Sequence, residues 1–129
     1  MAKVLVALAE ERVLSYLADG LANEGFDTRR ANSLEGVLEC LADERFDAVV
    51  ADIFQPVIDG VALFATIARS SPKTKIVALM DFQSARARSY EINLWVDSII
   101  VKPFAVERIR KELSFVLAGE QPVEAPVSA

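Results

Sequence analysis

Two residues that can handle charge follow predicted strands at different places in the chain. Asp52 comes directly after the apolar run 48–51, and Lys102 precedes a proline directly after the apolar run 98–101. An aspartate at the end of a buried strand can act as a nucleophile or a metal ligand, and it can equally cap a turn. A lysine there can pair with an anion, or it can be a surface residue before a turn proline. The two together indicate an anion-binding site more strongly than either residue alone.

Further acids lie beside another strand end. The first apolar run ends in Leu8-Ala9 and continues with Glu10 and Glu11. These acids can face a metal or phosphate pocket, or they can form the acidic first turn of a helix, where they interact favourably with the helix dipole. We favour the second interpretation, because the dipole gives a sufficient reason for both acids.

Composition limits the classes of protein to consider. The chain has 129 residues, which suits one domain with one core. A net charge of −5 argues against a nucleic-acid binder. The single cysteine, Cys40, excludes an intrachain disulfide, and we expect a cytoplasmic protein. The lack of histidine excludes histidine-based zinc sites and Ser-His-Asp triads, and no apolar stretch is long enough to span a membrane.

The hydrophobic pattern alternates between strand and helix, and it positions the charged residues. Strands are predicted at 3–7, 27–31, 47–51, 75–80 and 98–101, and the short, polar second strand is expected near a sheet edge. Helices are predicted from Val13 to Leu21, after a Ser33 cap, and at 60–70, 84–92 and 106–117. Such alternation predicts a parallel sheet with helices on both faces, whose ligands bind beyond the carboxyl ends of the strands. Four phenylalanines are predicted to lie in the core: Phe26, Phe46, Phe64 and Phe115.

The stretches FDAVVADIFQPVIDG and VKPF, in this order, resemble receiver domains of two-component response regulators. The resemblance extends from Lys3 to about Leu117. It implies a flavodoxin-like α/β fold, a three-layer sandwich around a five-stranded parallel sheet in the order 2-1-3-4-5. We expect the receiver domain to occupy residues 1–118, followed by a flexible tail at 119–129.

The resemblance also implies a chemistry. In the family, an aspartate accepts a phosphoryl group from a phosphohistidine or an acyl phosphate, with the help of Mg²⁺. The match assigns the phosphoacceptor to Asp52 and its phosphate-pairing partner to Lys102, which precedes a cis proline in the family. If Mg²⁺ binds, the expected ligands are Asp52, Glu10 and the backbone of Phe54.

Four positions depart from the family pattern. The pair of acids that holds Mg²⁺ falls on Leu8 and Ala9, which offer no oxygen to a metal. The hydroxyl residue after the fourth strand falls on Met80, and the aromatic switch residue of the fifth strand falls on Ile99. We therefore expect Mg²⁺ binding to be weak or absent, because affinity follows the number of charged ligands.

Asp81 leaves a second possibility open. With Glu10 and Asp52 it could form a displaced metal site, or it could repel an incoming phosphoryl group. Because few acids compete for Lys102, we predict that this lysine pairs with Asp52 in the resting state.

The apolar segment before and within the fifth strand is a candidate interaction face. Leu94 and Trp95 replace small residues, and Ile99 follows. This segment can pack in the core or form a contact patch, and the two interpretations are about equally supported. In the family, the face built from the fourth helix, fifth strand and fifth helix serves output and dimerisation, so a homodimer through it is possible.

We therefore expect a stand-alone, degenerate receiver that is not an enzyme and signals through protein contacts, largely without phosphorylation. Its partner would be a histidine kinase, a phosphotransferase or an effector, with no nucleic acid and no membrane. The alternative is a receiver that accepts phosphate at Asp52, with Mg²⁺ held by Glu10 and Asp81. A domain that binds a small ligand at the same strand ends ranks last, because the chain has no Gly-rich phosphate loop.

Overall fold

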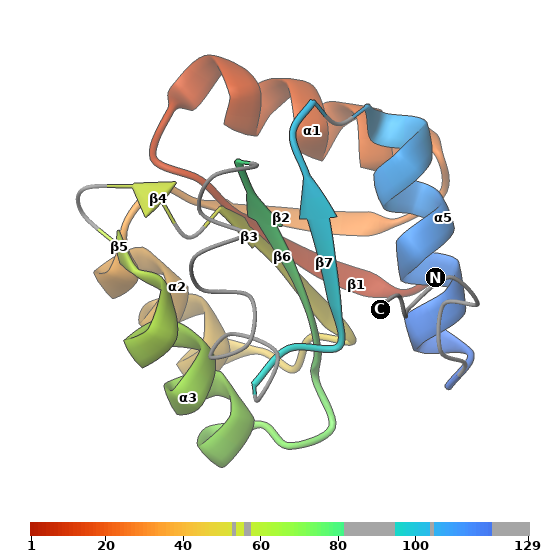
Figure 1. The fold of residues 1–129 in the computed structure, drawn as a ribbon. Helices are drawn as coiled ribbons and strands as arrows, with labels where there is room; N and C mark the ends of the chain where they lie inside the picture. The colour runs from red at the N-terminus through yellow and green to blue at the C-terminus, as the bar shows by residue number, and fades with distance from the viewer. Residues whose placement is uncertain (53, 56–57, 82–94, 104, 120–129) are drawn as a thin grey trace, which may run out of the picture.

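Five parallel strands form the central sheet of the protein. The computed structural model describes residues 1–52, 54–55, 58–81, 95–103 and 105–119. The strands, listed across the sheet, are β2 (Asp27–Ala31), β1 (Lys3–Ala7), β3 (Ala48–Asp52), β6 (Lys75–Met80) and β7 (Ser98–Val101). This order confirms the predicted flavodoxin-like arrangement, in which the chain starts near the middle of the sheet and winds outward in both directions (Figure 1).

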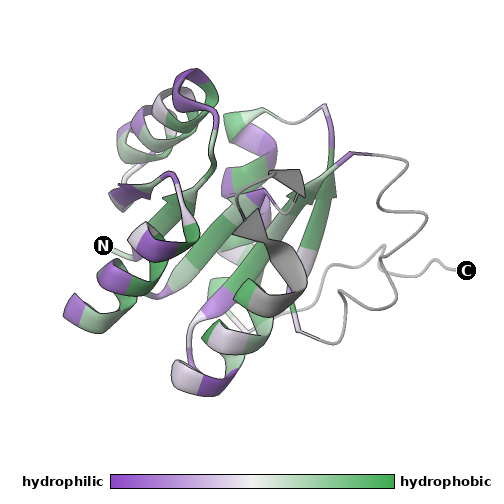
Figure 2. Cartoon of the chain, turned by 90° about the vertical axis from the view of Figure 1, so that its left-hand side faces the viewer, coloured by the Kyte–Doolittle hydropathy of each residue, from purple (hydrophilic) through white to green (hydrophobic). Residues whose placement is uncertain are grey.

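The helices cover both faces of this sheet. Helices α1 (Glu11–Asn23) and α5 (Val106–Leu117) pack on one face, and α2 (Leu34–Asp43) and α3 (Gly60–Ser70) lie on the other (Figure 1). Apolar residues therefore concentrate in the strands and on the inner sides of the helices (Figure 2). The expected three-layer sandwich is confirmed.

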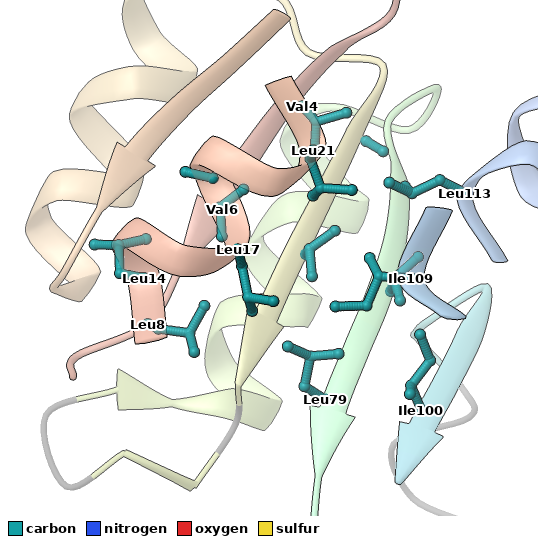
Figure 3. Close-up of a cluster of buried hydrophobic side chains, with 14 of the residues drawn as sticks. Val4, Val6, Leu8, Leu14, Leu17, Leu21, Leu79, Ile100, Ile109 and Leu113 are labelled. Carbon is teal, nitrogen blue, oxygen red and sulfur yellow. The ribbon is translucent and has the colours of Figure 1, made fainter. Parts of the chain in front are cut away.

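Alternate residues of each strand enter different cores, because successive side chains of a strand point to opposite faces. The α1/α5 core contains Val4, Val6, Leu8, Leu14, Leu17, Ala18, Leu21, Ala48, Val50, Val77, Leu79, Ile100, Ile109, Leu113 and Val116. The α2/α3 core contains Leu5, Ala7, Ala31, Val37, Phe46, Val49, Ala51, Leu63, Phe64, Ile67, Ile76, Ala78 and Met80. Figure 3 shows the α1/α5 core, where leucines of α1 meet valines of β1 and apolar residues of α5.

Helix boundaries follow the predicted signals. Ser33 caps α2, and its hydroxyl accepts a hydrogen bond from the Gly36 N–H at 3.1 Å. Gly25 follows α1 with φ at 103°, a conformation that suits glycine. Strand β3 lies one residue later than predicted, so that it includes Asp52.

A short antiparallel hairpin was not predicted. Strand β4 (Phe54–Gln55) pairs with β5 (Ile58–Asp59) between β3 and α3. Two-residue strands are too short to produce a periodic pattern, so the sequence carries no signal for them. The predicted helix at 84–92 and all but the first residue of the predicted tail lie outside the described residues.

One of the four phenylalanine predictions was wrong. Phe46 and Phe64 are buried and Phe26 is half-buried, but Phe115 is 38% exposed. The inward stripe of α5 instead holds Glu112 together with Ile109, Leu113 and Val116. Glu112 tolerates burial because the Ser98 hydroxyl donates a hydrogen bond to its carboxylate at 2.5 Å, and Arg108 lies 3.5 Å away.

Glycine 20 allows α1 and α5 to approach closely. A Cβ atom added at Gly20 would lie 2.5 Å from Cγ2 of Val106. A glycine inside a helix costs about 1 kcal/mol relative to alanine. The close contact with Val106 gives a steric reason for glycine at this position, because the Cβ atom of an alanine would overlap the valine side chain.

We predict that Gly20→Ala lowers the free energy of unfolding by about 1 kcal/mol, because the steric cost exceeds the gain in helix propensity. In a Val106→Ala background the same change should be neutral or stabilising, since the obstructing methyl groups are gone. Urea denaturation of the four variants of this cycle measures both effects. A Gly20→Ala effect of the same size in both backgrounds would contradict the packing explanation.

Candidate functional site

The carboxyl ends of the strands bring Asp52 and Lys102 together. Asp52 is the last residue of β3, and its side chain is 2% exposed. Lys102 directly follows β7, two strands away in the sheet, and its side chain is 45% exposed. The Lys102 Nζ lies 3.4 Å from the Asp52 Oδ2. The predicted pairing of the two residues is confirmed.

The backbone around Lys102 fixes the position of the lysine. Its N–H donates a hydrogen bond to the Met80 carbonyl at 2.8 Å, which continues the pairing of β7 with β6 beyond the strand. The Lys102-Pro103 peptide bond is cis, as the resemblance implied. The ammonium group thus reaches the buried carboxylate from the solvent side.

The end of β1 presents apolar groups to this site. Ala7 is in register with Ala51, which places Leu8 level with Asp52 on the neighbouring strand. Leu8 is 1% exposed and belongs to the α1/α5 core, and its N–H donates to the Ala31 carbonyl at 3.1 Å. Ala9 is half-buried. Neither residue has a side-chain oxygen for a cation.

The following two acids stabilise the start of α1. Glu10 is the N-cap residue, and its Oε1 accepts a hydrogen bond from the Val13 N–H at 2.7 Å. Glu11 lies in the first turn and accepts a hydrogen bond from the Asn32 side chain at 2.6 Å. The favoured interpretation, that these acids serve the helix, is confirmed. Whether Glu10 also binds a metal stays a prediction.

The end of β6 is also apolar next to the site. Met80 is fully buried in the α2/α3 core, and Asp81 follows it in a half-buried position. Phe54, whose backbone is an expected Mg²⁺ ligand, lies in β4, two residues after Asp52. Among the described residues, no three acidic, cysteine or histidine side chains are grouped closely enough to hold a metal ion.

Comparison with known proteins identifies the family. The model of the response regulator receiver domain matches residues 4–114. The chain belongs to the response regulator receiver domain family. It is therefore a receiver domain of two-component signalling, and response regulators of this kind interact with kinases and effectors.

The similar proteins have longer chains. The response regulator MprA of Mycobacterium sp. (strain KMS) is 26% identical over 126 residues, which cover 98% of this chain and 55% of MprA. The transcriptional regulatory protein PcoR of Escherichia coli is 23% identical over 104 residues, which cover 81% of this chain and 46% of PcoR. The chain thus spans about half the length of these relatives.

Solved structures show the same fold. A receiver domain protein from Clostridium thermocellum superposes with a TM-score of 0.85 at 17% identity, covering 92% of this chain and 96% of that one. TrrA from Thermotoga maritima, solved in complex with Mg²⁺-BeF, gives a TM-score of 0.79 at 24% identity, covering 88% and 97% of the two chains.

The candidate contact segment of the receiver domain is partly buried. Trp95 and Ile99 are both half-buried and pack against the α2/α3 core, so each contributes to the core and keeps some exposed surface. The Arg69 guanidinium lies 6.0 Å from the centre of the Trp95 ring. No local sequence pattern predicts this contact, because its two partners lie far apart in the chain. Leu94 lies outside the described residues.

Among the helices of the described residues, none has the length and apolar character needed to cross a membrane.

We predict that Lys102→Met lowers the free energy of unfolding by about 1–2 kcal/mol, because it removes a cation from beside a buried carboxylate. The estimate stays small because the lysine is half exposed and its charge is screened by water. In an Asp52→Asn background the same change should have little effect.

Urea denaturation of the double-mutant cycle measures the coupling between the two residues. Lys111→Met is a matched control, because Lys111 is an exposed lysine on α5 without an ion pair among the described residues. An equal effect of Lys102→Met in both Asp52 backgrounds would show that the ion pair does not stabilise the fold.

Proposed function

We propose that this receiver domain is degenerate and passes signals through protein contacts, largely without phosphorylation of Asp52. The observation that carries the proposal is the position of Leu8. This residue lies level with Asp52 and is buried in the α1/α5 core, at a point where the family places a metal-binding acid. An alkyl side chain at that point supplies no ligand to Mg²⁺.

Charge balance supports the proposal. A phosphoryl group that moves to Asp52 develops negative charge on its oxygens, and a divalent cation normally offsets that charge. Mg²⁺ requires a nearly octahedral set of oxygen ligands, and its affinity depends on nearby carboxylates. Lys102 supplies one positive charge to this pocket, at 3.4 Å from Asp52. A single ammonium group replaces a dication poorly.

The surrounding side chains support independence from phosphorylation in a second way. Met80 is fully buried and has no hydroxyl group to bond a phosphoryl oxygen. Ile99 packs against the α2/α3 core, where the family has a mobile aromatic ring. A phosphoryl group on Asp52 would therefore lack the two partners that transmit its presence to the surface.

Signalling through contacts needs a surface, and we propose the segment around Trp95 and Ile99. These residues combine a half-buried aromatic ring, an apolar strand residue and the nearby Arg69 guanidinium. Aromatic residues and arginine are enriched where proteins bind each other. The partner is a histidine kinase, a phosphotransferase or an effector, and the same face can serve a homodimer.

A second candidate function rests on the Asp52–Lys102 pair itself. The expected acceptor Asp52 lies 3.4 Å from the Lys102 ammonium, which supports this candidate. The similar TrrA structure holds Mg²⁺-BeF. Glu10 or Asp81 would then supply the missing oxygens for Mg²⁺ after a rearrangement, in which Glu10 gives up its hydrogen bond with the Val13 N–H.

Incubation with Mg²⁺ and acetyl phosphate, followed by intact-mass measurement, separates the two candidates. We predict that the wild-type protein gains no stoichiometric phosphoryl adduct, because the pocket lacks the acids that hold Mg²⁺. A receiver domain with the complete set of acids, treated in parallel, shows that the reagent is active.

Two variants make this result interpretable. Ala9→Asp returns one carboxylate to the end of β1 and should increase any adduct above the wild-type level. Asp52→Asn should remove any adduct that forms at the acceptor. A stoichiometric wild-type adduct that Asp52→Asn abolishes would overturn the proposal and establish the second candidate.

A further inference from the structure

A cleft lies at the amino ends of the strands, at the other end of the sheet from Asp52. It has a volume of about 520 Å³ and is formed by the connection from α2 to β3 and the connection from α3 to β6. Strands β3 and β6 start at this cleft and end at Asp52 and Met80. At the usual rise of a strand, these ends lie roughly 15 Å from the cleft. The cleft is therefore separate from the receiver site, and its size falls within the range of small-molecule sites.

Two acids line this cleft, and one of them, Glu44, is paired with cations. The Glu44 carboxylate accepts hydrogen bonds from the Lys3 ammonium at 2.5 Å and from the Arg29 guanidinium at 3.1 Å. The hydrogen bond from Lys3, followed by the interactions with Arg29, lowers the pKa of Glu44. At neutral pH the carboxylate is therefore ionised, and the two cations balance its charge. The Asp47 Oδ2 accepts the Lys3 backbone N–H at 2.7 Å.

The bases of the cleft are not paired in this way. Arg45 and Lys73, one from each connection, line the cleft, and both residues are exposed. Neither forms an ion pair or a side-chain hydrogen bond with any of the residues that the structure describes. Arg45 and Lys73 outnumber Asp47, the lining acid that accepts only a backbone N–H, so the uncompensated charge at the cleft is positive. The chain as a whole has a net charge of −5.

The cleft is also preformed, and part of its lining is apolar. The buried Thr74 hydroxyl donates to the Phe46 carbonyl at 2.8 Å, and the Lys75 N–H donates to the Asp47 carbonyl at 3.0 Å, so the two connections are fixed against each other. Leu41, Phe46 and Pro72 supply apolar surface. A preformed site binds with a smaller entropic cost than one that must be ordered by its ligand.

The helix ends restrict the ligand further. Both α2 and α3 end at the cleft, and the carboxyl end of a helix carries partial negative charge and carbonyl groups that accept hydrogen bonds. These ends disfavour a bare phosphate ion. They suit a ligand that brings N–H donors together with its anionic group.

We propose that this cleft binds a small organic carboxylate with an aromatic or apolar body and an N–H donor, and that Arg45 and Lys73 hold the carboxylate. Such a site would give a receiver domain an input that does not pass through Asp52. Binding at the cleft does not depend on whether Asp52 is phosphorylated, so its test is independent of the proposed function.

The test uses N-acetyl-L-phenylalanine as the probe and ¹H–¹⁵N NMR spectra of the full chain. We expect saturable shifts of the amides of residues 44–47, 70, 71, 73 and 74. The Arg45→Gln/Lys73→Gln variant should weaken binding by about tenfold or more, as two partly exposed charge interactions would. Lys111→Gln, which neutralises an exposed lysine on α5, should bind as the wild type does, and so should Asp52→Asn.

Two further ligands complete the experiment. The neutral N-acetyl-L-phenylalanine amide should bind more weakly than the carboxylate, and inorganic phosphate should produce no saturable shifts at these residues. The proposal is overturned by a lack of saturable shifts at millimolar probe, by equal binding of the amide, or by unchanged binding to the Arg45→Gln/Lys73→Gln variant. Binding of phosphate alone would also overturn it.

Discussion

The contact between Lys102 and Asp52 is the interaction on which the site depends. The Asp52 side chain is almost fully buried at the end of a central strand, where an ionised carboxylate is costly unless a cation or hydrogen bonds compensate it. Lys102 reaches this carboxylate from the exposed side, across the end of β6. The fold can thus keep a charged group at the centre of the sheet edge without a metal ion.

Other residues at the carboxyl ends of the strands belong to the two hydrophobic cores. Leu8 joins the α1/α5 core and Met80 joins the α2/α3 core, so two positions that handle Mg²⁺ or phosphate in the family now stabilise packing. Glu10, which follows Leu8 and Ala9, accepts a hydrogen bond from the first turn of α1. Each of these side chains has a structural role, in a core or at the start of a helix.

The sequence predicted the layers and the Asp52–Lys102 contact, because both follow from local patterns. Continuous apolar runs gave the strands, Ser33 and Gly25 gave helix ends, and residues at strand ends had to meet because parallel strands end at one edge. Contacts between distant segments were not predictable in the same way. The burial of Glu112 in place of Phe115, the Arg69–Trp95 contact and the cleft at Arg45 and Lys73 all depend on how separate elements pack.

The central claim is that the pocket around Asp52 does not hold a divalent cation. Its most direct test is a titration of the ¹⁵N-labelled protein with Mg²⁺, and then with paramagnetic Mn²⁺, followed by ¹H–¹⁵N NMR. We predict no saturable shifts for the amides of residues 8–10, 52 and 102 at millimolar Mg²⁺, and no selective Mn²⁺ broadening of these signals. Saturable binding centred on Asp52, and lost in Asp52→Asn, would contradict this account.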